Sequence, residues 1–101
     1  MLNLIETDCQ DYVRLMVEGR VDVTTSPQLQ SRILAIFQKK NNLVLDFLNV
    51  EYVSSAALRA LLIGQKTAVS KGGSMKLVNV GDTVMKVFEM SGFSKILNVE
   101  K

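Results

Sequence analysis

The run LVLDFL, residues 43–48, is almost continuously apolar and holds a single acidic residue, Asp46. A strand with one face in water alternates apolar and polar side chains, so a run of this kind is typical of a strand covered by helices. We therefore expect it to be the central strand of a sheet. Asp46 needs a hydrogen-bonding partner if it is buried there, and we interpret it as structural.

The apolar segments around this run alternate between strand-like and helix-like periods, which indicates a mixed α/β fold. We expect a mixed, mostly parallel sheet of about five strands packed with about three helices. The first two strands read as an antiparallel hairpin, and the later strand-helix-strand route favours a parallel crossover. The expected strands are residues 2–7, 12–17, 43–48, 75–80 and 96–99, and the expected helices start at Ser26, at Ser54-Ser55 and near Asp82.

Local signals set the ends of these elements. Gly19 is expected to break the second strand, and Ser26 is expected to cap the first helix because Pro27 fits the first turn. The second helix should bury residues 58, 61, 62 and 69 on one side. With 101 residues and 48% apolar content, we expect residues 1–101 to form a single domain.

The charge pattern argues against nucleic acid and membranes as partners. Twelve basic and 10 acidic residues leave a net charge of +2, and the basic residues are scattered rather than gathered in a stripe. No apolar run approaches the ~20 residues that span a bilayer, and polar residues begin too early for a signal peptide. We therefore expect a cytoplasmic protein with no membrane insertion and no direct contact with nucleic acid.

Two adjacent serines lie in the segment VEYVSSAALRALL, residues 50–62, where a loop passes into the second helix. Loops at the carboxyl ends of parallel strands carry ligand sites, and helix starts favour negative charge. Ser54 is the natural cap, which leaves Ser55 on the first turn with its hydroxyl free. The alternative interpretation is that both serines only cap and solubilise the helix.

Enzymatic and cofactor chemistry find little support. Histidine is absent and Cys9 is the only cysteine, so one chain can build no disulfide, no Cys/His zinc site and no Ser-His or Cys-His pair. The closest lysine to Ser55 is Lys66, and no GxxxxGK[ST] or GxGxxG loop is present. We expect no catalytic residue, no metal and no cofactor.

Three segments together resemble the STAS domain family, specifically its bacterial anti-sigma-factor antagonists. LVLDFLNVEYVSSAALRALL resembles the signature segment of that family. EGRVDVTTSPQLQSRI resembles the stretch that leads into its first helix, and KLVNVGDTVMKVFEMSGFSKIL resembles its last crossover, third helix and closing turn. The resemblance covers nearly the whole chain.

The resemblance implies a partner-switching module. The unphosphorylated domain binds an anti-sigma factor that is also its serine-protein kinase, and thereby frees a sigma factor; phosphorylation ends that binding. The family's phosphorylated serine maps onto Ser55, with Ser54 as the competing acceptor, and Asp22 matches an acidic position near that serine. Many regulated members have Asp and Gly where this chain has Ser54 and Ala57.

The expected partner face includes Asp22, Ser54, Ser55 and Arg59, the nearest charged residue on the second helix. Arg59 either contacts the partner or phosphate, or is simply solvated. Asp22 either orients a hydroxyl or binds the amides of its own turn. Met90 and Phe93 could form an apolar lip for a partner, if the end of the third helix is exposed.

Two other roles fit the same family. A STAS accessory subunit of a membrane transport or sensory complex would carry a similar sequence. The sequence also leaves open whether the domain forms a homodimer, because surfaces on a common fold decide such contacts.

Overall fold

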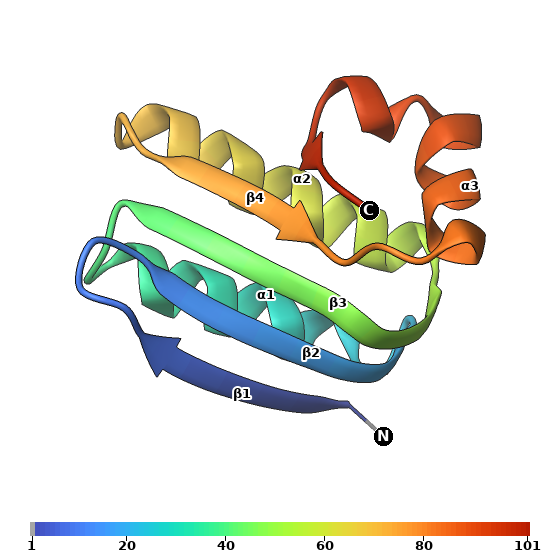
Figure 1. The fold of residues 1–101 in the computed structure, drawn as a ribbon, viewed down its shortest axis with the longest axis horizontal. Helices are drawn as coiled ribbons and strands as arrows, with labels where there is room; N and C mark the ends of the chain where they lie inside the picture. Colours follow the sequence, from blue (N-terminus) through green and yellow to red (C-terminus); the bar gives the residue numbers. More distant parts are fainter. Residues whose placement is uncertain (1) are drawn as a thin grey trace.

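In the computed structural model, which describes residues 2–101, the chain forms a five-stranded sheet and three α-helices (Figure 1). The expected α/β class and the number of elements are confirmed. The strands are β1 Asn3–Asp8, β2 Val13–Val21, β3 Asn42–Val53, β4 Ser74–Val78 and β5 Asn98–Val99. The helices are α1 Ser26–Phe37, α2 Ser55–Ser70 and α3 Asp82–Ser91, followed by a short 3-10 turn, η1 Phe93–Lys95.

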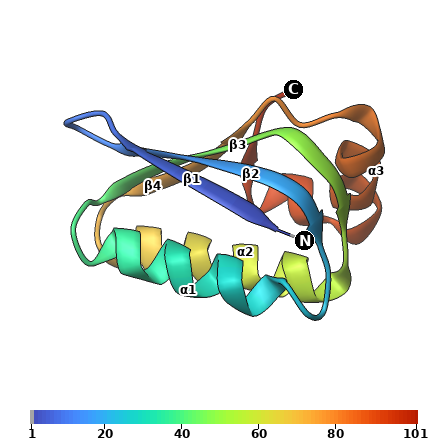
Figure 2. The ribbon, with the colours of Figure 1, turned by 90° about the horizontal axis from the view of Figure 1, so that it is seen from below.

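The strands lie in the order β1-β2-β3-β4-β5, with β1 antiparallel to β2 and the other pairs parallel. The predicted hairpin and crossover are therefore confirmed. Helices α1 and α2 lie side by side on one face of the sheet (Figure 2). Because β2, β3 and β4 are parallel, the three helices that follow them all start at the same edge of the sheet.

Gly19 does not end β2, contrary to expectation. The strand continues to Val21, with Gly19 at a φ of 109° and a shift in the pairing with β3 beside it. A bulge of this kind bends a strand and absorbs an extra residue without ending the ladder. β3 also runs on, through the stretch expected to be a loop, until Val53 pairs with Val21. Two extended strands thus finish side by side.

The core lies between the sheet and the pair α1 and α2. Leu15, Leu45 and Leu77, from the three central strands, are fully buried beneath the helices. The predicted apolar side of α1 is confirmed, because its four large members are all buried: Leu29, Ile33, Ile36 and Phe37. Burial of this apolar surface is the main driving force that fixes the two helix starts against the strands.

The buried side of α2 differs partly from the expectation. Leu58 and Leu61 are buried as predicted, but Leu62 is only half-buried and Val69 is 64% exposed. Small residues take up the rest of that side, at Ala57, Ala60, Gly64 and Ala68. A Cβ built at Gly64 would lie 2.8 Å from the sulfur of Met75 and 2.9 Å from a methyl of Ile33. The small side chains therefore allow α2 to pack closely on α1 and β4.

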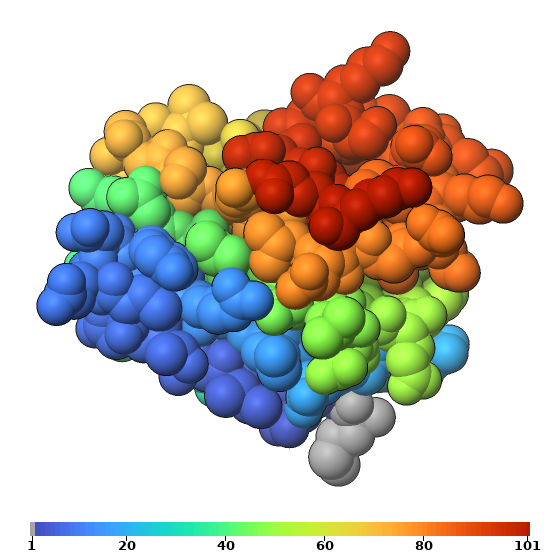
Figure 3. All heavy atoms as spheres, viewed as in Figure 1, coloured from blue at the N-terminus to red at the C-terminus, as the bar shows by residue number. Residues whose placement is uncertain are grey.

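β3 is the central strand of the sheet, as expected, but α1 and α2 cover only one of its faces, and the opposite face of the sheet is open. Figure 3 shows this face, formed by side chains of the strands and by the C-terminal segment. Leu48 of β3 is 64% exposed there, whereas Asp46 is 2% exposed. Asp46 can be buried because polar groups of Arg14, Leu48 and Asn79 donate hydrogen bonds to its carboxylate.

Candidate functional site

Ser54 and Ser55 occupy different environments at the start of α2. Ser54 is the N-cap, with an extended backbone (φ −97°, ψ 176°), and its hydroxyl oxygen accepts from the N–H of Ala57 at 3.3 Å. Its own N–H donates to the carbonyl of Val21 at 2.9 Å. The predicted capping role of Ser54 is therefore confirmed, and its position is tied to the end of β2.

Ser55 is the first residue of α2 and its side chain is exposed. Among residues 2–101, none forms a side-chain hydrogen bond with its hydroxyl. The backbone of the first turn is anchored by Ser54, so the Ser55 oxygen is displayed in a fixed place at the helix start. A hydroxyl in this setting can be reached by an enzyme that modifies it.

Asp22 lies in the turn between β2 and α1, next to Val21. One of its carboxylate oxygens accepts from the N–H and hydroxyl groups of Thr24 and from those of Thr25, at 2.7 to 3.1 Å. The hydroxyl of Thr24, together with the N–H of Thr25, lowers the pKa of Asp22 to about 2. Of the two interpretations of Asp22, its hydrogen bonds support the one in which it holds its own turn.

Ser26 does not cap α1, contrary to expectation, and the Asp22 turn explains why. Thr25 is the N-cap residue, and the N–H of Ser26 donates to the carbonyl of Asp22 at 2.8 Å. That backbone bond takes the place of a side-chain cap. Ser26 is instead the first helical residue, and its side chain is buried between α1 and α2, 6% exposed.

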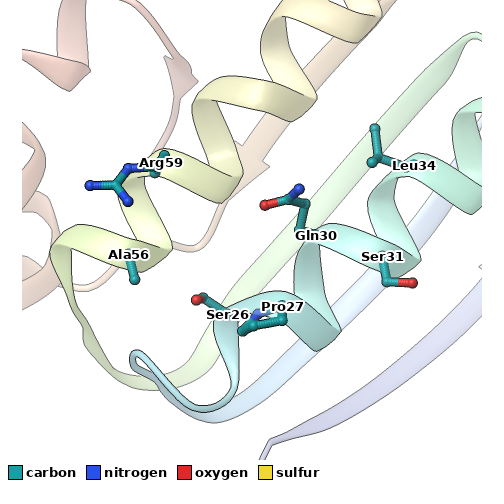
Figure 4. A pocket seen from close by; sticks show the side chains of 7 residues that line it. All are labelled: Ser26, Pro27, Gln30, Ser31, Leu34, Ala56 and Arg59. Carbon is teal, nitrogen blue, oxygen red and sulfur yellow. The ribbon is translucent and has the colours of Figure 1, made fainter.

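Arg59 lies one turn after Ser55 on α2 and is exposed. It borders a hollow of about 360 Å³ between the first turns of α1 and α2, which we call the α1–α2 groove (Figure 4). Ser26 and Gln30 of α1 line the opposite wall. Sequence reasoning placed Arg59 near Ser55 but missed both α1 residues. The available signal was that α1 and α2 follow neighbouring parallel strands, which brings their starts together.

Met90 and Phe93 lie around the C-terminal end of α3, whereas Ser55 lies at the start of α2. Met90 is 87% exposed, so the end of α3 is open to solvent as an apolar lip requires. Phe93 is half-buried and packs against the core, and the second exposed apolar side chain in this region is Ile96. Of the two residues expected to form a lip, Met90 is therefore exposed and Phe93 is only partly so.

Asp46 joins β3 to the loop that precedes α3. Its carboxylate accepts from Arg14 at 2.6 Å, from the side-chain amide of Asn79 at 3.1 Å and from the N–H of Leu48 at 3.0 Å. Burial raises the pKa of Asp46, but these hydrogen bonds outweigh burial and the net effect lowers it. The partners that sequence reasoning required for Asp46 are thus present, and they fix the loop at the start of α3.

Within residues 2–101, no α-helix is both long enough and apolar enough to span a membrane. The same residues contain no group of three or more His, Cys, Asp and Glu side chains placed to hold a metal ion.

Comparisons with known proteins find a family model, relatives and solved structures that are similar to this chain. The STAS domain family model matches residues 5–101. The anti-sigma-B factor antagonist of Bacillus subtilis (strain 168) is 23% identical over 90 residues, which covers 89% of this chain and 83% of that protein. The structure of an anti-sigma factor antagonist from Mycobacterium paratuberculosis has a TM-score of 0.87 at 22% identity, with 99% and 86% of the two chains covered. The Bacillus cell fate determinant SpoIIAA in its phosphorylated form gives 0.74 at 22% identity, covering 100% and 92%.

Proposed function

The chain belongs to the STAS domain family, and on that premise we propose that it is an anti-sigma-factor antagonist switched by phosphorylation of Ser55. In its unphosphorylated form it binds an anti-sigma factor that is also its serine-protein kinase, and a sigma factor is released. Relatives named as anti-sigma factor antagonists support this function, since they align along most of the chain. These names are those of regulators, and we propose no enzymatic role.

The observation that carries the proposal is the exposed hydroxyl of Ser55 beside the engaged hydroxyl of Ser54. Ser54 accepts the capping hydrogen bond from Ala57, so adding a phosphate there would disturb the helix start. Ser55 can be modified without the loss of any such bond. This difference favours Ser55 over Ser54 as the phosphate acceptor.

A phosphate at this place changes binding more than folding. It adds about −1.5 to −2 charges, and the free amides and dipole of a helix start stabilise negative charge. A partner that packs against a neutral hydroxyl must instead desolvate or repel an anion, which costs several kcal/mol. Phosphorylation can therefore release the partner while the domain keeps its fold.

The proposed partner face lies at the edge of the sheet where α1 and α2 start. It comprises the Asp22 turn, Ser54, Ser55 and Arg59, with Asp22 acting by holding the shape of its turn. Met90 and Phe93 form a separate apolar contact at the end of α3. In this proposal residues 1–101 act as one cytoplasmic domain, without direct contact with nucleic acid and without membrane insertion.

The test is to incubate the purified protein with candidate anti-sigma kinases and ATP, and to map the phosphate by mass spectrometry. We expect one phosphate, on Ser55. Ser55→Ala should abolish the modification, whereas the matched control Ser54→Ala should keep it. Phosphate only at a distant threonine, or on Ser54 alone, would contradict the proposal.

A further inference from the structure

The open face of the sheet is formed by side chains that alternate with the core residues. Because Leu15, Leu45 and Leu77 point toward the helices, their neighbours along each strand point the opposite way. The pairing of the strands places these neighbours in two rows: Ile5, Met16, Asp46 and Val78, and beside them Arg14, Val44 and Lys76. Together with Leu48 they make up what we call the sheet face (Figure 3).

The apolar members of the sheet face reach solvent on four neighbouring strands. Leu48 is 64% exposed and Ile5 is 46% exposed, and Met16, Val44 and Val78 are each partly exposed. Single apolar side chains on a surface are ordinary, but apolar side chains gathered on adjoining strands form a patch. A patch of this kind with polar residues around it marks a site of protein interaction.

The charged side chains of the sheet face are already paired within the chain. Arg14 donates to Asp46 at 2.6 Å, and Lys76 lies 2.6 Å from a carboxylate oxygen of Glu100. Glu18, at the border of the face, accepts from the side-chain amides of two asparagines at 3.0 Å each. Charges that have a partner in their own chain provide little attraction for a charged protein. The sheet face therefore suits an occupant that is apolar and close to neutral.

The helices on the other side of the sheet have the reverse character. α1 and α2 contain three basic residues, Arg32, Arg59 and Lys66, and no acidic one. Two copies of the chain that met through these helices would bring like charges together, which opposes association. Two copies that met through their sheet faces would instead join apolar surface to apolar surface. A second copy of the chain thus has the chemistry that the sheet face requires.

The size of the sheet face sets the strength of such a contact. The molecule measures 31 by 28 Å across the view of Figure 1. Contact over about two thirds of that outline buries roughly 600 Å² on each copy, or about 1,200 Å² in total. This area is at the lower end for specific protein–protein interfaces, so we expect a dissociation constant in the micromolar range.

We infer that the sheet face is the contact surface of a homodimer, in which two copies pack their open sheets together about a twofold axis. Leu48 and Ile5, the most exposed apolar side chains of the face, are the main contact residues. Ser55 stays accessible in both copies, because α2 lies on the opposite face of the sheet (Figure 2). The dimer does not depend on the proposed function.

The test is sedimentation equilibrium of the full chain at concentrations from about 5 to 500 μM. We expect a reversible monomer–dimer equilibrium whose dissociation constant changes little between about 50 and 500 mM salt, because the contact is apolar and its charges are paired. Leu48→Lys should weaken the dimer at least about tenfold, since the two new cations lie in an apolar contact. Ile5→Lys, on another strand, should also weaken it and serves if Leu48→Lys does not fold.

The matched control is Val69→Lys, because Val69 of α2 has the same exposed fraction as Leu48, 64%, and receives the same new charge. It should leave the dissociation constant unchanged. A parent protein that stays monomeric at about 500 μM would overturn the inference, as would equal losses in Leu48→Lys and Val69→Lys or dissociation as the salt concentration rises. These measurements involve no kinase, so their failure and a failure to phosphorylate Ser55 are separate results.

Discussion

The two serines that begin α2 differ in what their oxygen atoms do. Ser54 uses its oxygen to cap the helix, and Ser55 leaves its own oxygen in solvent. Sequence reasoning distinguished them correctly, because the preference of serine for the N-cap is strong and local. It could not foresee that Ser26, with the same pattern before α1, would be buried in a groove. The capping group there comes from the backbone of the Asp22 turn.

Removing each serine separately should give different costs. We expect Ser54→Ala to lower the free energy of unfolding by about 1 kcal/mol, because the N–H of Ala57 loses its acceptor. Ser55→Ala should change it by less than about 0.5 kcal/mol, as is usual for exposed positions. Chemical denaturation of the two variants beside the parent protein measures both values. Equal losses would mean that Ser55 is also structural.

Asp22 predicts a pH dependence of stability. Its pKa is lowered from 3.8 to about 2 in the folded protein, first by the Thr24 hydroxyl and then by the Thr25 N–H. A carboxylate with a lowered folded pKa stabilises the protein fully above its unfolded pKa, and that stability is lost as the pH falls through the folded pKa. We therefore expect the stability difference between the parent protein and Asp22→Asn to shrink from about pH 4 to pH 2. Urea unfolding across this range tests it, and a difference independent of pH would contradict the assignment.

At the scale of elements, the sequence predicted the number, type and order of helices and strands, because these follow from apolar periodicity. Lengths were less predictable. β2 continues past Gly19 and β3 continues past Asn49, because the two strands go on pairing with each other on both sides of a bulge. Pairing between two strands cannot be read from the local sequence of either one. The buried side of α2 was also partly misassigned, since the close approach of α1 favours small residues over Val69.

The contact of α2 with α1 and β4 depends on Gly64. Gly64→Ala should destabilise the domain by about 1 to 3 kcal/mol, because the new methyl group meets Met75 and Ile33. Alanine is the better helix former, so packing and propensity predict opposite signs. Lys66→Ala is the control, because it places alanine at an exposed position of the same helix. If Gly64→Ala is neutral or stabilising in thermal and urea unfolding, the close packing of these elements is wrong.

At the scale of the whole molecule, the parallel order of β2, β3 and β4 gathers the functional features at one edge. The Asp22 turn, the Ser54-Ser55 start and the α1–α2 groove all lie where these strands end. The sequence pointed to this edge through the general rule for parallel sheets. The groove itself needs the packing of two helices and so could not be derived from either helix alone. A rigid scaffold with a modifiable edge fits a protein whose binding changes while its fold does not.

The central claim is that a phosphate on Ser55 removes the partner and leaves the domain folded. The most direct measurement is titration calorimetry. The anti-sigma kinase that phosphate mapping identifies is titrated with two forms of the protein, one unmodified and one carrying phosphoserine at position 55. The account predicts about a thousandfold weaker binding of the phosphorylated form, equivalent to about 4 kcal/mol, with melting temperatures within a few degrees. Equal affinities of the two forms, or unfolding of the phosphorylated one, would contradict it.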